Sequence, residues 1–361
     1  MTGRGQPPEK TMSDHANSPP ARQFTSDTYA GICPEAIAAL QQANRGHAAA
    51  YGDDPWTAQA AALLRDFFEK NCAVFFVLTG TAANSLALAA LCRSYHSVIC
   101  HADAHIHTDE CGAPEYASGG IKLLTVESGD AKITADAARR IAAKQRDVHS
   151  SKPHVLSLSQ ATEAGTVYQI EELRALGEAA HELGLLVHMD GARFANALAT
   201  LKVPPRAVTW QAGVDVLCFG GTKNGILAGE AIVFFNRALA EEFEYRRKQA
   251  GQLPAKMRFL TAQWVAMLQS AAWLRNAERA NAMARLLESE LRTIDKLEVL
   301  RPAEANAVFV RVPERWRERL HERGWFFYTI ADGMRLMCSW DTEPQDIARL
   351  MNDLRDVVAE G

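Results

Sequence analysis

The sequence predicts an α/β fold, with a mostly parallel sheet sandwiched by helices and a smaller C-terminal α+β domain. Three observations support this prediction. From about residue 24 to residue 250, short apolar runs that suit strands alternate with helical patterns. The runs are apolar at consecutive positions, as expected for strands buried on both faces of a parallel sheet. After residue 259 the pattern changes to a long helical region followed by short strands.

The expected elements follow one another along the chain in a regular order. We expect strands at residues 73–78, 97–100, 122–126, 154–158, 185–189, 214–219 and 231–235. Helices are expected at residues 82–91 and 171–183, and Gly184 should stop the second one. The C-terminal part is expected to contain a helical region from 260 to about 297, strands at 307–310 and 334–338, and a helix at 344–358.

These patterns divide the chain into three expected segments. Residues 1–22 contain four prolines but no Leu, Ile, Val, Phe, Tyr or Trp, so they cannot bury enough apolar area to fold. We therefore expect residues 1–22 to be a disordered tail, and they lack the apolar stretch of a secretory signal. Residues 23–255 should form a large domain and residues 256–361 a small one.

Composition excludes several classes of function. A formal net charge of −4 gives no basic surface for nucleic acid or an anionic membrane. The apolar runs are far shorter than the roughly 20 residues that a membrane span needs. The seven cysteines contain no Cys-x-x-Cys pair, which argues against a disulfide framework or a zinc ribbon. We expect reduced thiols and a cytoplasmic location.

Three polar motifs follow expected strands, where active sites of open α/β sheets lie. Gly80 opens a helix, and a helix N-terminus suits a phosphate, although a plain Thr-capped helix has the same pattern. Asp190 could accept a proton, bind a metal or simply cap a helix. Lys223 stands between glycines, either with a chemical role or as a solvated loop residue.

The three motifs are more specific together than singly. A phosphate-binding turn, a carboxylate and a lysine 33 residues later (223 − 190) match what pyridoxal 5′-phosphate requires. The lysine amine forms an imine with the cofactor, and the carboxylate keeps the pyridine nitrogen protonated. The sequence therefore predicts an enzyme that uses pyridoxal phosphate and acts on an amino acid.

Five motifs in order resemble those of one known family. They are Phe24-Thr25-Ser26-Asp27-Thr28-Tyr29, Gly80-Thr81-Ala82-Ala83-Asn84, Ala102-Asp103-Ala104-His105-Ile106, His188-Met189-Asp190-Gly191-Ala192-Arg193 and Gly221-Thr222-Lys223. They resemble the motifs of low-specificity L-threonine aldolases, which are fold-type I pyridoxal phosphate enzymes of the β-eliminating lyase group. The resemblance runs from about Phe24 to the C-terminus and is strongest to the bacterial branch that also cleaves phenylserine.

The resemblance implies a role for each matching residue. Lys223 would form the Schiff base, Asp190 would pair with the pyridine nitrogen, and His105 would stack on the cofactor ring. The full cofactor-binding set would be Gly80, Thr81, His105, Asp190, Arg193, Thr222 and Lys223. The substrate carboxylate would be bound by Ser26, Arg193 and Arg335. Arg335 also interrupts an apolar strand, where a guanidinium suits either a carboxylate ligand or an internal ion pair.

The resemblance implies retro-aldol cleavage of L-threonine or L-allo-threonine, and of phenylserine, to glycine and an aldehyde. His105 or His149 would be the catalytic base, since imidazole titrates near neutral pH, and the sequence does not choose between them. Many family members have Glu-Asn-Thr-His where this chain has residues 159–163, Ser-Gln-Ala-Thr-Glu, so any role for a histidine there is lost.

Other functions remain open at this level. A β-eliminating lyase or an aminotransferase would use the same cofactor. A metal-dependent hydrolase could use His101, His105 and His107, but no complementary ligand set appears elsewhere, so we expect no metal. The expected partner is a small amino acid, and the resemblance implies a homo-oligomer, either a dimer or a tetramer.

Overall fold

The computed structural model describes residues 22–144, 147–330 and 333–360. Of the expected disordered tail, all but Arg22 lies outside these residues. The chain forms two compact units: Ile32–Arg275 is the larger, and the smaller combines the described residues up to Gly31 with those from Asn276 onward.

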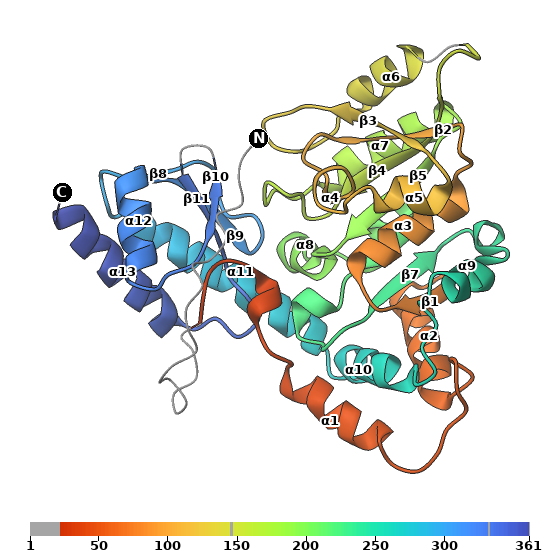
Figure 1. Cartoon of the computed structure of the whole chain (residues 1–361), viewed down its shortest axis with the longest axis horizontal. Coiled ribbons are helices and arrows are strands. Elements are labelled where there is room, and N and C mark those ends of the chain that lie inside the picture. The colour runs from red at the N-terminus through yellow and green to blue at the C-terminus, as the bar shows by residue number, and fades with distance from the viewer. Residues whose placement is uncertain (1–21, 145–146, 331–332, 361) are drawn as a thin grey trace. The chain divides into compact units, whose positions relative to one another are not determined.

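The larger unit contains a seven-stranded sheet (Figure 1). Its strands are β1 (Ala73–Val77), β2 (His96–His101), β3 (Lys122–Val126), β4 (Lys152–Ser159), β5 (Leu186–Gly191), β6 (Val216–Phe219) and β7 (Glu230–Phe234). Their order across the sheet is β1-β7-β6-β5-β4-β2-β3, and β7 alone among them runs antiparallel to its neighbours β1 and β6. The predicted mostly parallel sheet is confirmed, and each expected strand end lies within two residues of the observed one.

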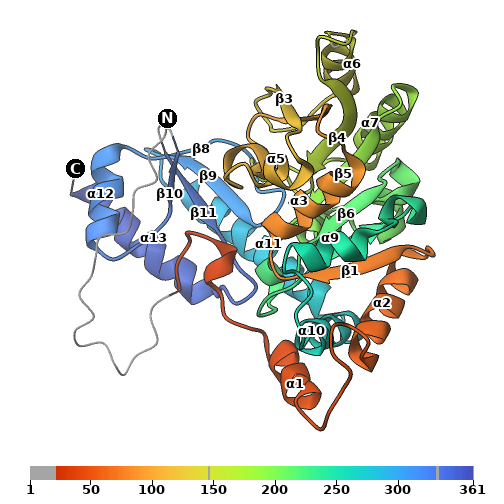
Figure 2. The same cartoon turned by 45° about the vertical axis from the view of Figure 1, so that its right-hand side comes forward.

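Helices connect these strands and cover the sheet. They are α1 (Pro34–Ala43), α2 (Pro55–Phe68), α3 (Gly80–Leu91), α4 (His105–Thr108), α5 (Ala113–Ser118), α6 (Ala135–Lys144), α7 (Ile170–Glu182), α8 (Phe194–Leu201), α9 (Phe243–Gln249) and α10 (Arg258–Gln269). Short 3-10 helices lie at Pro205–Val208, Trp210–Ala212, Thr222–Asn224 and Arg237–Ala240. Figure 2 shows α6 and α7 beside each other near β4, where they also pack together.

Both faces of the sheet are covered by apolar side chains. On one face, α3 and the strands bury a shared cluster that includes Leu88, Val98 and Ile232. On the other face, Phe219 of β6 packs against Phe68 and Phe194. All six residues of β2 are buried, which explains why the strands are apolar at consecutive positions.

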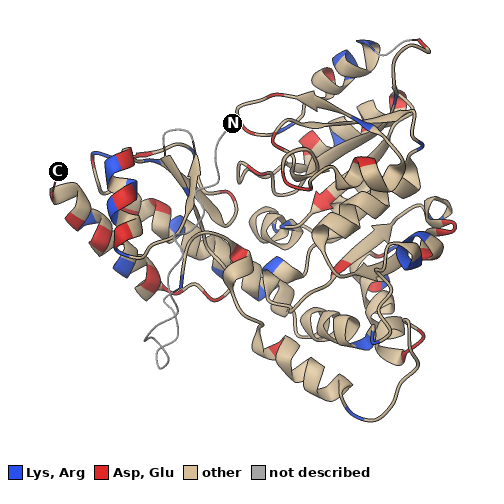
Figure 3. Ribbon diagram, in the orientation of Figure 1, with Lys and Arg blue, Asp and Glu red and all other residues tan. Residues whose placement is uncertain are grey.

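The smaller unit contains a four-stranded antiparallel sheet with the order β10-β11-β9-β8. Its strands are β8 (Glu298–Val299), β9 (Ala307–Arg311), β10 (Tyr328–Ile330) and β11 (Gly333–Met337), and its other elements are a 3-10 helix at Asp27–Tyr29, α12 (Glu314–Glu322) and α13 (Pro344–Ala359). The predicted small α+β architecture is therefore present. Basic and acidic residues intermix on α12 and α13 (Figure 3), as in the Arg319–Glu360 and Arg323–Asp353 ion pairs.

The helical region expected from residue 260 to about 297 is two helices. Helix α10 ends at Gln269, and α11 (Ala272–Leu291) begins after two non-helical residues, Ser270 and Ala271. Ala271 has a φ of 55°, which no α-helix permits, so the helical pattern alone did not reveal the break. Because α10 packs against α1 and α2, the division between the units follows Arg275 rather than residue 255. Among the described residues, no helix is both long and apolar enough to cross a membrane.

Candidate active site

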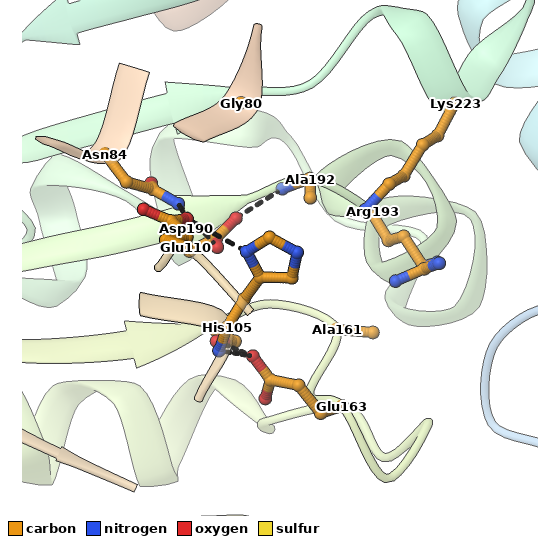
Figure 4. A pocket seen from close by; sticks show the side chains of 11 residues that line it. Gly80, Asn84, His105, Glu110, Ala161, Glu163, Asp190, Ala192, Arg193 and Lys223 are labelled. Carbon is orange, nitrogen blue, oxygen red and sulfur yellow. Dashed lines mark hydrogen bonds and ion pairs between the residues drawn. The ribbon is translucent and has the colours of Figure 1, made fainter. Parts of the chain in front are cut away.

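A pocket opens at the carboxyl edge of the seven-stranded sheet, inside the larger unit (Figure 4). Its lining comes from the ends of five strands and the segments that follow them: Gly80, Asn84, His105, Glu110, Ser159, Ala161, Glu163, Asp190, Ala192, Arg193 and Lys223. Carboxyl ends of parallel strands share one edge of a sheet, so residues far apart in sequence converge there. The three motifs singled out in the sequence meet in this pocket.

Asp190, the fifth residue of β5, is buried and oriented by two donors. Its Oδ1 accepts the backbone N–H of Ala192 at 2.9 Å, and its Oδ2 accepts Nδ2 of Asn84 at 2.9 Å. Asn84 stands four residues after Gly80 on α3, so both residues lie on the same face of that helix. This carboxylate is held in one orientation at the pocket wall.

Two glycines let the chain that leads from β6 to Lys223 pass close to neighbouring backbone, Gly220 at Ala192 and Gly221 at Gly229. A Cβ on Gly220 would lie 2.6 Å from the carbonyl oxygen of Ala192. A Cβ on Gly221 would lie 2.7 Å from the carbonyl oxygen of Gly229. No side chain fits at either position, so the glycines next to Lys223 are required by packing.

A buried carboxylate on β7 anchors the turn that carries Lys223. Glu230 accepts the backbone N–H of Gly221 at 2.6 Å. Burial raises the pKa of Glu230, while hydrogen bonds from the turn and the charge of Lys223 act in the opposite direction. The hydrogen bond from Gly221 to the buried Glu230 carboxyl group therefore holds the turn that carries Lys223 in place.

The N-terminus of α3 forms another wall of the pocket. Thr79 caps the helix by accepting the N–H of Ala82 at 3.2 Å. A Cβ on Gly80 would meet nothing within 4 Å, so the space beside this backbone is open. First-turn N–H groups have no partner within a helix, and they can therefore face an anion in that space.

His105 lies between two acidic side chains. Its backbone N–H donates to Oε1 of Glu163 at 3.0 Å, and its Nδ1 lies 2.9 Å from Oε1 of Glu110. Burial is the first cause that raises the pKa of both Glu110 and Glu163, and the charge of Asp190 adds to it. Sequence reasoning gave these two glutamates no role in cofactor chemistry. The signal available in the sequence was the position of Glu110, five residues after His105.

The profile of the family described as Beta-eliminating lyase matches residues 23–315. The chain belongs to the beta-eliminating lyase family. The low specificity L-threonine aldolase of Pseudomonas sp. (strain NCIMB 10558) is 55% identical over 341 residues, which cover 94% of this chain and 99% of that one. That of Pseudomonas aeruginosa is 56% identical over 349 residues, which cover 96% and 99%. The structure of a Leishmania major threonine aldolase has a TM-score of 0.88 and 28% identity, covering 93% of this chain and 99% of that chain.

In this member of the beta-eliminating lyase family the fold is that of fold-type I pyridoxal phosphate enzymes, and the cofactor is pyridoxal 5′-phosphate. The pocket fits that cofactor by the chemistry of its groups. It offers one amine on Lys223, one oriented carboxylate on Asp190, and the open N-terminus of α3 beside Gly80. Figure 4 shows the side chains of Lys223, Arg193 and Asp190 among those that line the pocket.

The remaining predicted residues of the larger unit have different positions. Arg193 lines the pocket at the start of α8, as expected from its place three residues after Asp190. Thr81 and Thr222 adjoin Gly80 and Lys223 but are not among the lining residues. His149 is exposed and precedes the first residue of β4, at the amino edge of the sheet. The structure does not bring His149 to this pocket.

The predicted substrate residues Ser26 and Arg335 belong to the smaller unit. Ser26 caps the 3-10 helix at Asp27–Tyr29 by accepting the N–H of Thr28 at 3.2 Å. Arg335 donates to the carbonyl oxygen of Thr25 at 3.4 Å, and its guanidinium lies 4.4 Å from the centre of the Tyr328 ring. The smaller unit thus brings Arg335 to the segment that carries Ser26.

The histidines of the alternative metal site have separate surroundings. His101 is buried, with Nδ1 3.0 Å from the backbone nitrogen of Asp103 and Nε2 3.0 Å from that of Ser128. His105 contacts Glu110, and His107 is exposed. In the part of the chain that the structure describes, no three His, Cys, Asp or Glu residues are placed to hold a metal ion.

Proposed function

We propose that the chain cleaves L-threonine and L-allo-threonine to glycine and acetaldehyde, and phenylserine to glycine and benzaldehyde. The observation that carries this proposal is the meeting of Lys223, Asp190 and His105 in one pocket. The identity of 55% and 56% to two Pseudomonas proteins named low specificity L-threonine aldolase supports the same reaction class.

The residues divide the work by their chemistry. Pyridoxal phosphate, when bound, supplies an electron sink for bonds at the amino-acid Cα. Lys223 offers the amine that attaches it, Asp190 the carboxylate for its ring nitrogen, and the first turn of α3 at Gly80 and Thr81 the N–H groups for its phosphate. Thr222 adjoins Lys223 at the same edge. Together these residues would hold the cofactor in a fixed orientation relative to the bound amino acid.

We assign the proton transfer at the substrate hydroxyl to His105. Cleavage requires that the β-hydroxyl lose its proton as the Cα–Cβ bond breaks and the aldehyde forms. A base must lie within hydrogen-bond reach of that proton, and His105 lines the pocket whereas His149 does not. The Cα then takes up a proton, which gives glycine.

The substrate carboxylate is assigned to guanidinium groups. Arg193 lines the pocket, and a planar guanidinium can pair with a carboxylate through two hydrogen bonds. Ser26 and Arg335 complete the proposed set, supported by the motif resemblance and by their proximity within the smaller unit. A homo-oligomer, a dimer or a tetramer located in the cytoplasm, is proposed from the same resemblance. Light scattering of the purified protein measures its mass and tests that assembly.

An assay of products tests the function. The purified protein is incubated with L-threonine, L-allo-threonine and phenylserine, and aldehyde release is measured beside release of pyruvate or other keto acids. Lys223→Ala protein, prepared identically, is the blank. Aldehyde and glycine in equal amounts support the proposal. Keto acid without aldehyde would identify a β-eliminating or aminotransferase reaction. Activity lost to a chelator, without visible cofactor absorption, would identify a metal enzyme instead.

A further inference from the structure

Glu110 is a buried carboxylate in the wall of the pocket, and the proposed function gives it no role. Its side chain is 0% exposed, and Oε1 has two partners: Nδ2 of Asn84 at 2.8 Å and Nδ1 of His105 at 2.9 Å. The same Asn84 nitrogen also contacts Asp190 at 2.9 Å. A continuous chain of hydrogen bonds therefore joins Asp190, Asn84, Glu110 and His105.

The direction of these hydrogen bonds follows from the groups involved. The amide nitrogen of Asn84 has two N–H groups, enough for one to each carboxylate. While Glu110 is ionised it can only accept hydrogen bonds, so the 2.9 Å contact then requires that Nδ1 of His105 carry the proton and donate this hydrogen bond. In a neutral imidazole, Nε2 then holds the lone pair. Figure 4 shows this second nitrogen on the side of the ring away from Glu110, toward Arg193.

We propose that Glu110 is a positioning residue for the cleavage reaction, fixing His105 with its proton on Nδ1 so that Nε2 can accept the proton of the substrate hydroxyl. Asn84 holds Glu110 in place and links it to Asp190. When Nε2 takes the proton, the imidazolium forms next to a carboxylate, and such charge-assisted hydrogen bonds are stronger than neutral ones. This inference rests on the role of His105 under the proposed function.

Glu110→Gln is the first test, because it keeps the size of the side chain and removes its charge. An amide both donates and accepts, so it satisfies either tautomer of His105 and no longer selects one. We expect kcat for threonine cleavage to fall about 10- to 100-fold, part of what a general base contributes, with KM changed less than about threefold. Glu127→Gln, the same change at an exposed position after β3, is the matched control and should leave both constants unchanged. A Glu110→Gln enzyme with the kcat of wild type overturns the proposal.

A double variant shows whether Glu110 acts through His105. In a His105→Asn background, Glu110→Gln should lower kcat by less than about twofold, since the group that it positions is gone. If Glu110→Gln lowered kcat by the same factor with and without His105, Glu110 would act on the fold or on Asp190, and the proposal would be overturned. Thermal melting accompanies each variant, and Glu110→Gln should melt no lower than wild type because it removes a carboxylate whose pKa burial raises.

A spectroscopic measurement separates this inference from the proposed function. In holoenzyme with ¹⁵N-labelled histidine, the ring signals of His105 are those missing from His105→Asn. We expect the proton on Nδ1 in wild type and a mixture of tautomers in Glu110→Gln. A wild-type proton on Nε2, or identical ring signals in both proteins, overturns the inference whether or not the protein releases aldehyde. Absence of aldehyde release with the expected tautomers would overturn the proposed function and, with it, the role of Glu110 in cleavage, but not the conclusion that Glu110 fixes the tautomer of His105.

Discussion

The two edges of the large sheet both carry histidines, but their surroundings are opposite in charge. At the carboxyl edge, His105 contacts Glu110 and Glu163 and lines the pocket. At the amino edge, the rings of His96 and His154 pack with their centroids 4.0 Å apart. Burial, followed by the charges of His154, Lys152 and Arg93, lowers the pKa of His96 to about 4.

This difference shows that neighbours, and not residue type, decide what a histidine does. Beside a carboxylate an imidazole is oriented by a hydrogen bond, and we propose that His105 in this setting exchanges a proton with the substrate. Beside lysine, arginine and another imidazole, the charged form is disfavoured and the ring serves packing. His149 lies in the exposed turn just before β4, at this second edge.

The largest expected effect follows from removing the amine at the carboxyl edge. Lys223→Ala should abolish the visible absorption of bound cofactor and lower kcat by about 10³-fold or more, since the covalent attachment that we propose for Lys223 would be lost. Absorption spectra after gel filtration and aldehyde release measure the two effects. Lys152→Ala, the same change at the amino edge, should behave as wild type. Retained absorption and activity in Lys223→Ala would remove the central assignment.

The second prediction compares His105 with His149. His105→Asn should lower kcat by about 10²-fold, the lower end of what a general base contributes. His149→Asn should change kcat by less than about twofold, because the structure leaves it exposed outside the pocket. Steady-state kinetics with L-threonine measure both variants. A larger loss of kcat in His149→Asn than in His105→Asn would show that a residue at the amino edge, His149, takes part in catalysis.

A third prediction concerns the smaller unit. Arg335→Ala should reduce kcat/KM by an amount that corresponds to about 2–4 kcal/mol of transition-state stabilisation, mainly through a higher KM, because the charge-assisted pair that we propose with the substrate carboxylate would be lost. Arg319→Ala is the matched control: its ion pair with Glu360 is exposed, and such pairs contribute little. Kinetics near those of wild type in Arg335→Ala would assign the carboxylate to other residues.

Sequence reasoning succeeded where local signals were strong. Consecutive apolar residues located the strands, and Gly184 marked the end of α7 to within a few residues. The glycines around Lys223 drew attention to that lysine, and the structure shows that packing requires those at 220 and 221. It did not locate Glu110 or Asn84 in the site, because their roles depend on hydrogen bonds between residues that are far apart in the sequence. Asn84 is 26 positions from Glu110 and 106 positions from Asp190. The break at Ala271 was missed because alanine favours helices, and a positive φ there is imposed by tertiary structure.

The smallest expected effect is a difference in how the two edges respond to acid. Because the pKa of His96 falls from its ordinary 6.5 to about 4 on folding, the unfolded chain takes up this proton first as the pH drops. Stability is therefore lost between about pH 6.5 and pH 4. For Glu110 and Glu163 the folded pKa is raised, so the folded protein binds their protons first and stability is gained as the pH falls through those values.

Two variants separate these opposing contributions. From pH 7 to pH 5, His96→Asn should lose about 1 kcal/mol less unfolding free energy than wild type, a value reduced for solvent screening. Glu110→Gln should lose more than wild type, because the compensating gain at the carboxyl edge is removed. Urea unfolding at each pH measures the slopes. If both variants followed the wild-type slope, the two edges would not differ in their electrostatics, and the contrast between His96 and His105 would have to come from access to the pocket alone.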